Sequence, residues 1–244
     1  MKFRFEVYFK ILALLAISVL SDCNSTKEIS KESRISEVNN AVFCLSVIVP
    51  NQQTPQKRAI GTGFLVSENL LATAFHVKED LNRTAVINDL SKTKTIAWKK
   101  FDNGDYIEIP IKLSAVEQDA DMALYSFDTE NLQQQSKTRE IKPLKIADRL
   151  PNIGEDVLTI GYYSTMEFPF NSLGNVSMID NGEDIYSDMT LLSGNSGSPL
   201  VSMKTGEVLG VNIKVMTMGD GTIRLGISKR ISKLKPLIEK AASK

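Results

Sequence analysis

The sequence predicts an all-β protein that ends in a helix. From Ala41 onward, short β-branched or aromatic runs recur between turn signals, and no stretch of the first half keeps a helical period over three turns. The runs fall into two series, separated by a polar segment at residues 129–142. A regular succession of short strands is typical of a sandwich or a barrel, and it disfavours parallel βαβ units.

The first series occupies residues 41–128. Its predicted strands lie at residues 41–49, 60–66, 70–74, 84–87, 95–101, 106–113 and 122–127. Asparagine, glycine and aspartate residues supply the breaks between these runs. We interpret the polar segment 129–142 as the connection to the second series.

The second series occupies residues 143–228. Its predicted strands lie at residues 143–146, 157–162, 175–179, 197–202, 207–215 and 222–227, with hairpin turns at 204–206 and 219–221. In the closing segment 229–244, the apolar residues Ile231, Leu234, Leu237 and Ile238 follow a helical period. This pattern predicts a C-terminal helix with one face packed on the body of the protein.

The first 22 residues predict a secretory signal peptide. Three basic residues precede an apolar run at residues 11–20, and small polar residues follow it. Ten residues in a helix rise only about 15 Å, roughly half the hydrocarbon core of a bilayer, so a permanent transmembrane span is not expected. We therefore expect an exported protein of the periplasm or the cell envelope.

Cys23 follows this signal directly. Residues 20–23, LSDC, resemble the lipobox of bacterial lipoproteins. The resemblance implies lipidation of Cys23, contact with the membrane only through that anchor, and a polar tether at residues 23–40. Two alternatives stay open: a freely secreted protein cleaved nearby, and a disulfide between Cys23 and Cys44. For Cys44, which lies in an apolar run, a buried inert thiol is the default expectation.

The charge balance and the histidine count exclude several classes of function. The chain has 29 basic and 29 acidic residues, so it lacks a broad positive field that would release counter-ions from phosphates, and nucleic acid is not an expected partner. The single histidine, His76, excludes multi-histidine metal sites, and we expect no metal and no cofactor. Any Ser-His or Cys-His mechanism must use His76.

Three short segments together offer a base, an acid and a nucleophile. They contain His76 at 71–77, Asp121 at 119–124, and Ser196 at 193–200. A serine hydroxyl needs an imidazole to take its proton, and the imidazole needs a carboxylate on its other nitrogen. Asp119 competes for the acid role, but Asp121 immediately precedes a predicted apolar strand and is therefore preferred. The N–H groups of Gly194 and Ser196 are placed to stabilise an oxyanion.

The motif GNSGSP at residues 194–199, the run GTGF at residues 61–64, and the chain order histidine, aspartate, serine resemble the trypsin-like serine proteases. The similarity is greatest to the bacterial glutamyl endopeptidases and the high-temperature-requirement proteases, and it extends over roughly residues 41–230. It implies two six-stranded antiparallel β-barrels, at 41–128 and 143–228, with the active site in the cleft between them.

The resemblance also implies a primary specificity pocket. Thr190 would lie near its base, and Asn212, Ile213 and Lys214 would line its wall. Because no acid stands at Thr190, a strong preference for lysine or arginine is not expected. Glutamyl endopeptidases hold the substrate carboxylate with a histidine at the place of Asn212, so glutamate selectivity is not expected either. We therefore expect the pocket to accept small or apolar substrate side chains.

Two hypotheses of different class follow from the sequence. The first is a serine endopeptidase that acts on peptide or protein substrates through an acyl-enzyme on Ser196. The second is a catalytically inactive exported binding protein on the same fold. The second rests on Phe75, which occupies a position where the family usually has alanine and whose ring could disturb the seating of His76, or on an oxyanion loop that is not formed.

Overall fold

The computed structural model describes residues 29–49, 56–89, 91–136, 139–163, 166–219, 221 and 223–242. The predicted signal peptide and Cys23 lie outside the described residues. The described residues from Lys31 onward form one compact unit. Within the described ranges, no helix has the length and the apolar content needed to cross a membrane.

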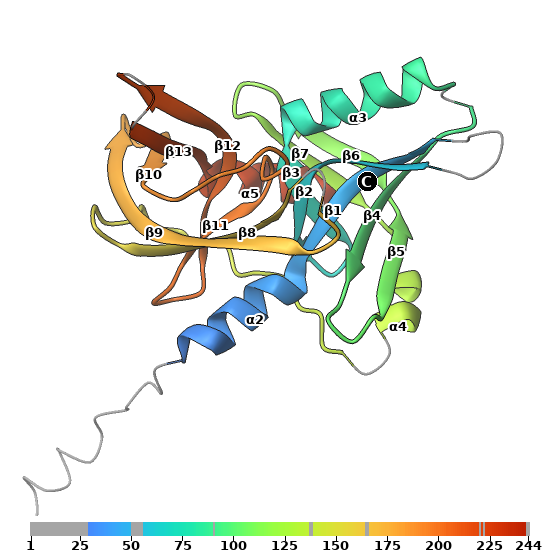
Figure 1. The fold of residues 1–244 in the computed structure, drawn as a ribbon, viewed down its shortest axis with the longest axis horizontal. Helices are drawn as coiled ribbons and strands as arrows, with labels where there is room; N and C mark the ends of the chain where they lie inside the picture. Colours follow the sequence, from blue (N-terminus) through green and yellow to red (C-terminus); the bar gives the residue numbers. More distant parts are fainter. Residues whose placement is uncertain are drawn as a thin grey trace, which may run out of the picture. The chain divides into compact units, whose positions relative to one another are not determined.

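The N-terminal half is a seven-stranded antiparallel sheet in the order β5-β4-β1-β2-β3-β7-β6 (Figure 1). Its strands are β1 (Val42–Val49), β2 (Gln56–Ser67), β3 (Leu70–Ala74), β4 (Lys94–Lys100), β5 (Tyr106–Pro110), β6 (Lys112–Glu117) and β7 (Met122–Ser126).

The predicted closed, six-stranded form of this half is wrong, since the sheet is a seven-stranded half-barrel. One cause lies at Pro110, which ends β5 and has no N–H to donate to a ladder. The predicted strand at 106–113 therefore divides into β5 and β6, separated by Ile111. These two strands form opposite edges of the sheet, β5 beside β4 and β6 beside β7.

The predicted strand at residues 84–87 is also wrong, because these residues end helix α3 (Phe75–Ile87). The helix buries only Val77, Leu81 and Ala85, which are spaced by four residues and form one narrow apolar face. Val86 and Ile87 are exposed at its end. This weak periodicity explains why the β-branched run at the end of the helix suggests a strand.

The C-terminal half is a closed six-stranded barrel in the order β10-β13-β12-β11-β8-β9, so the prediction of a six-stranded barrel is confirmed here. Its strands are β8 (Asp156–Tyr162), β9 (Pro169–Asp180), β10 (Asp184–Ser187), β11 (Pro199–Ser202), β12 (Val208–Met218) and β13 (Ile223–Arg230). The strand expected at 143–146 is wrong: that segment makes a single parallel bridge, Ile146 to Val208, and β10 takes the sixth place.

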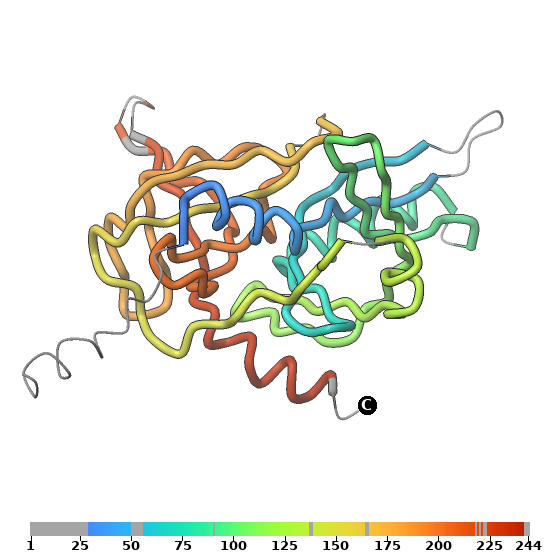
Figure 2. The backbone as a smooth tube through the Cα atoms, turned by 90° about the horizontal axis from the view of Figure 1, so that it is seen from below, coloured from blue at the N-terminus to red at the C-terminus, as the bar shows by residue number. Residues whose placement is uncertain are grey.

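Among the described residues, three α-helices lie outside the sheets besides α3: α2 (Lys31–Ala41), α4 (Thr129–Ser136) and α5 (Leu234–Ala242), the last preceded by the 3-10 turn η1 (Ile231–Lys233). Helix α5 confirms the predicted C-terminal helix. It leaves the C-terminal barrel and packs on β6 and β7 of the N-terminal sheet (Figure 2). Helix α4 lies inside the segment that the sequence marks as a connection.

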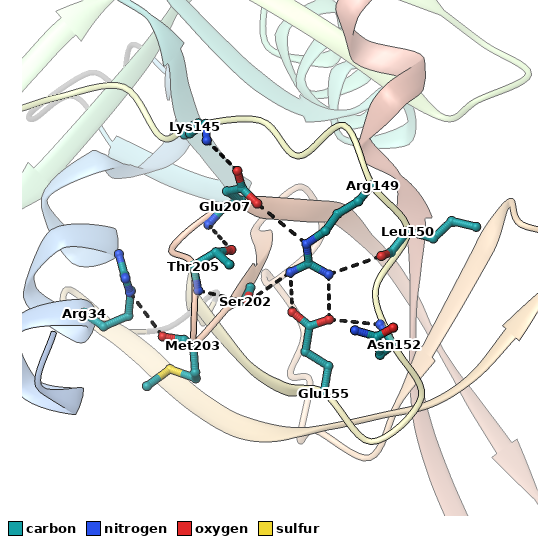
Figure 3. Close-up of polar contacts among 10 residues, drawn as sticks. All are labelled: Arg34, Lys145, Arg149, Leu150, Asn152, Glu155, Ser202, Met203, Thr205 and Glu207. Atoms are coloured by element: carbon teal, nitrogen blue, oxygen red, sulfur yellow. Dashed lines mark hydrogen bonds and ion pairs between the residues drawn. The ribbon is translucent and has the colours of Figure 1, made fainter. Parts of the chain in front are cut away.

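Helix α2 covers residues that the sequence assigns to the polar tether. Its Arg34 is 3% exposed, pairs with Glu37, and donates from Nε to the Met203 carbonyl at 3.4 Å (Figure 3). At the other end of the helix, the buried Lys99 ammonium donates to the Asn39 and Val42 carbonyls. The helix also buries Val38 and Ala41, but because charged residues make part of the contacts that hold it, its hydropathy does not reveal that it is packed.

The two halves meet through short polar contacts around Thr62 in β2. The Thr62 Oγ1 donates to the Gly194 carbonyl at 2.8 Å, and the Thr62 N–H donates to the Ser196 carbonyl at 2.9 Å. The same hydroxyl accepts the Tyr162 N–H at 2.9 Å. The loop that carries Ser196 is therefore fixed directly to the N-terminal sheet.

Candidate active site

His76 and Asp121 form a pair at the edge of the N-terminal sheet. His76 is in the first turn of α3, immediately after β3, and Asp121 ends the turn that precedes β7. The His76 Nδ1 lies 2.9 Å from Asp121 Oδ2 and 3.2 Å from Oδ1. An ionised carboxylate only accepts hydrogen bonds, so Nδ1 carries the proton and Nε2 is left with its lone pair.

The backbone supports this pair. Asp121 adopts a left-handed conformation with φ +50°, and its Oδ1 also accepts the His76 N–H at 2.9 Å. The Asp121 carbonyl accepts the Phe75 N–H at 3.0 Å. One residue thus orients the imidazole ring and satisfies two free N–H groups at the start of α3. Asp119, the competing acid, is exposed in the same turn, and no described contact links it to His76.

Phe75 does not prevent this geometry. Its ring is partly buried, and the Lys78 ammonium lies 4.9 Å from the ring centroid. The His76–Asp121 pair forms beside it with ordinary hydrogen-bond lengths.

Ser196 lies in the loop between β10 and β11. Its Oγ donates to the Ile213 carbonyl at 3.4 Å, and among the described hydrogen bonds none joins Ser196 to His76. The two segments are nevertheless close. A Cβ on Gly61 would lie 2.8 Å from the Val77 side chain and 3.1 Å from the Ser196 carbonyl. Catalytic hydrogen bonds are often long or misaligned before substrate binds, so the rotamer seen here is compatible with a serine nucleophile.

The turn before Ser196 has a defined type. The Asn195 N–H donates to the Leu192 carbonyl at 3.0 Å, and Gly194 has φ +100°. Ser193 is not among the described residues with positive φ. A turn with positive φ only at its third residue is of type II, and types I and II differ by a flip of the central peptide. The positive φ of Gly194 therefore fixes the direction in which its N–H points.

Within residues 194–198 of this loop, two N–H groups have no protein acceptor among the described contacts. The N–H groups of Asn195, Gly197 and Ser198 donate to Leu192, Asn212 and Asn195 carbonyls at 2.8 to 3.0 Å. For Gly194 and Ser196, the described contacts contain no acceptor. These are the two N–H groups that the sequence assigns to an oxyanion, and the loop keeps both available for a ligand oxygen.

A cavity of about 310 Å³ opens beside Ser196. Asn212, Ile213 and Lys214 line it, as the resemblance implies, together with the apolar Leu191 and Val215, which sequence reasoning did not single out. Lys214 is the one charged residue among its lining residues, and no acid is among them.

Thr190, expected near the base of the pocket, is not among the lining residues. It is exposed, and its N–H donates to Ser172 Oγ at 3.0 Å. The part of the chain that the structure describes contains no group of three or more His, Cys, Asp or Glu side chains placed to hold a metal ion.

Cys44 is not among the residues that line the cavity. It is a free, fully buried thiol in β1, and burial raises its pKa to about 12. A thiol that stays protonated at neutral pH is a poor nucleophile, as expected for a structural cysteine.

The sequence profile of the trypsin-like peptidase domain matches residues 61–211, more than half of the chain. The chain belongs to this family. Among curated proteins, no sequence matches it. Among solved structures, the chain is similar to the crystal structure of the serine endoprotease from Yersinia pestis, with a TM-score of 0.62 at 20% identity. The match covers 87% of this chain and 66% of the endoprotease chain, and at this identity it supports the fold alone.

Proposed function

We propose that this trypsin-like peptidase domain is a serine endopeptidase that cleaves peptide bonds through an acyl-enzyme on Ser196. The observation that carries the proposal is the combination of the 2.9 Å His76–Asp121 pair with the free Gly194 and Ser196 N–H groups beside the cavity. A binding protein that had lost catalysis would have no need for either.

In the first half of the proposed reaction, the Ser196 hydroxyl leaves the Ile213 carbonyl and donates to Nε2 of His76. The imidazole takes the proton as Ser196 Oγ attacks the substrate carbonyl carbon, and Asp121 stabilises the imidazolium. The Gly194 and Ser196 N–H groups stabilise the oxyanion of the tetrahedral intermediate. His76 then returns its proton to the leaving amine, and the acyl-enzyme remains.

In the second half, water replaces the amine. His76 takes a proton from the water as its oxygen attacks the acyl carbon, and it returns the proton to Ser196 Oγ when the acid product leaves. Ser196, His76 and the two N–H groups therefore return to their starting states. Since the chain has a single histidine, no other imidazole can replace His76 in this cycle.

We assign substrate binding to the cavity and to the adjoining edge of β12. Residues of β12 up to Val211 pair with β11, whereas from Lys214 onward β13 is the one partner of β12 among the described strands. The second edge of β12 next to Ser196 thus offers a ladder for an extended peptide. The apolar Leu191, Ile213 and Val215 support a preference for small or apolar side chains in the cavity.

We also propose that the protein is exported and lipid-anchored. The support for this part is the signal-like segment 1–22 and the lipobox-like residues 20–23.

A fluorophosphonate probe tests the proposed chemistry. We expect the folded wild-type protein to be labelled covalently, and we expect Ser196→Ala and His76→Ala each to abolish labelling and peptide hydrolysis. The alternative of an inactive binding protein predicts a folded wild type that the probe does not label, and that result would overturn the proposal.

A further inference from the structure

A cluster of buried polar side chains lies directly behind the Ser196 loop. It consists of Thr159 in β8, Ser198 just before β11, Asn212 in β12 and Ser228 in β13. Their exposed fractions are 0%, 0%, 1% and 0%. Polar groups buried to this degree are costly unless their hydrogen bonds are made, so the cluster requires a reason to exist.

Asn212 is the centre of the cluster. Its Nδ2 donates to Thr159 Oγ1 at 2.7 Å and to Ser198 Oγ at 2.9 Å. Its Oδ1 accepts the Ser228 hydroxyl at 2.6 Å. Both amide hydrogens and the amide oxygen are thereby used within the protein, and the side chain joins three strands of the barrel to the nucleophile loop.

The backbone of Asn212 also holds this loop. Its carbonyl accepts the Gly197 N–H at 2.8 Å, and its N–H donates to the Ser198 carbonyl at 2.9 Å. The Ser198 hydroxyl, held by the Asn212 amide, donates in turn to the Asn195 carbonyl at 2.6 Å. The residues on both sides of Ser196 are therefore fixed through Asn212.

The buried side chain within the loop does not provide this support. Asn195, next to Ser196, is 1% exposed, and neither its Nδ2 nor its Oδ1 has a hydrogen-bond partner among the described residues. A neutral amide without partners cannot fix the orientation of a loop. The Asn195 side chain therefore contributes no hydrogen bond that orients the loop among the described residues.

We propose that Asn212 is a positioning residue: it holds Ser196 and the two oxyanion N–H groups in the productive geometry through Ser198 and Gly197. This inference rests on the proposed function, and it changes the role that the family resemblance implies for Asn212. A side chain that is 1% exposed, with its hydrogen bonds already made, does not recognise the substrate.

Asn212→Ala tests the proposal. A misplacement of about 1 Å can cost roughly 10²-fold in rate. We therefore expect kcat to fall roughly 10-fold to 100-fold with KM changed less than about threefold, and fluorophosphonate labelling to slow by the same factor. The loss should be equal for peptides with apolar, acidic or basic side chains at the cleaved bond. An unchanged kcat, or an altered ratio among those peptides, would overturn the proposal.

Ser228→Ala is the matched control. It removes a buried hydroxyl of the same cluster that contacts Asn212 but makes no described contact with the Ser196 loop. We expect a smaller loss of stability than in Asn212→Ala, because one hydrogen bond of the cluster is lost instead of three, with kcat within about threefold of wild type. If Ser228→Ala lowers kcat as much as Asn212→Ala, the effect is general loosening of the barrel and the proposal fails.

Ser198→Ala is the alternative test of the proposal if Asn212→Ala does not fold. It removes the hydroxyl that links Asn212 to the Asn195 carbonyl, and we expect the same loss of kcat at constant KM. Unchanged kcat in this variant also overturns the proposal.

Amide hydrogen exchange separates failure of this inference from failure of the proposed function, because it needs no activity. The Gly197 and Ser198 N–H groups should lose protection in Asn212→Ala, or in Ser198→Ala where that variant is used, and keep it in Ser228→Ala. Equal protection in all variants would refute the positioning role even if the wild type proves inactive.

Discussion

In the N-terminal half, His76 and Asp121 meet at the ends of three elements, and their side chains are 39% and 24% exposed. In the C-terminal half, Ser196 stands on a loop whose supporting side chains, Thr159, Ser198 and Asn212, are at most 1% exposed. The first arrangement is a partly exposed, hydrogen-bonded pair held by a turn. The second is a buried, neutral hydrogen-bond cluster held by three strands of a closed barrel.

The difference has a physical consequence for mutation. One member of a partly exposed pair can be substituted without leaving a buried polar group unpaired, so the substitution should mainly affect the reaction. A substitution in a buried cluster leaves the remaining partner without a hydrogen bond, and water cannot reach that partner to replace it. We therefore expect changes to the His76–Asp121 pair to separate activity from stability, and changes to residues that contact the Ser196 loop in the C-terminal half to affect both.

Asp121→Asn should give the largest effect on activity. The amide can still accept the His76 N–H, and asparagine tolerates the φ of +50°, so the free energy of unfolding should change by less than about 1 kcal/mol. The amide no longer favours the Nδ1–H tautomer of His76. We expect kcat/KM to fall roughly 10⁴-fold, measured with a peptide substrate.

Asp119→Asn is the control for this variant, because Asp119 is exposed in the same turn. It should keep wild-type activity. If Asp119→Asn is inactive while Asp121→Asn is active, the assignment of the acid is wrong. The His76–Asp121 pair then no longer represents the catalytic part of the N-terminal half.

Gly197→Ala should affect stability and activity together. Gly197 has φ +86°, and an added Cβ would lie 2.1 Å from Thr73 Oγ1 and 2.2 Å from the Thr62 carbonyl. Both contacts belong to the N-terminal sheet, so the loop must move away from it. We expect a loss of roughly 4 kcal/mol in the free energy of unfolding, measured by urea titration, and loss of fluorophosphonate labelling.

Gly182→Ala isolates the backbone part of that cost. Gly182 has φ +69° and no heavy atom within 4 Å of an added Cβ. It should lose only about 1 to 2 kcal/mol and keep its activity. Equal losses in the two glycine variants would mean that the contact with Thr62 and Thr73 does not hold the loop.

Much of the site was predictable because it depends on motifs and chain order. The pairing of His76 with Asp121, rather than Asp119, and the free Gly194 and Ser196 N–H groups are where the sequence places them. The β-rich class and the C-terminal helix also follow from patterning.

The remaining features depend on packing that patterning does not report. Helix α3 has too narrow an apolar face, and helix α2 is held in part by a buried arginine, Arg34. The break at Pro110 turns one predicted strand into two. The cluster around Asn212 was invisible because polar residues such as Thr159 and Ser228 within strands can face solvent equally well, and only the register of the closed barrel turns them inward.

The far end of β11 tests whether ionic support behaves differently from the neutral cluster. There, Arg149 donates to both carboxylate oxygens of Glu155 at 2.8 and 2.6 Å and also faces Glu207, and the Asn152 N–H donates to Glu155 at 2.9 Å (Figure 3). Burial alone would raise the pKa of Glu155, but hydrogen bonds from Arg149, Ser202 and Asn152 outweigh it and lower the pKa to about 2.

A carboxyl with a folded-state pKa below its ordinary value of 4.5 stabilises the protein above that value, and the contribution is lost as the pH falls towards 2. At about 1.4 kcal/mol per pKa unit, the difference between wild type and Glu155→Gln should shrink by roughly 2 to 3 kcal/mol between pH 6 and pH 2, measured by urea unfolding. For Ser228→Ala, the difference in the free energy of unfolding from wild type should stay constant with pH, because its cluster carries no charge. If the difference for Glu155→Gln also stays constant, the support at this end of β11 is not ionic, and the two ends of the strand are held in the same way.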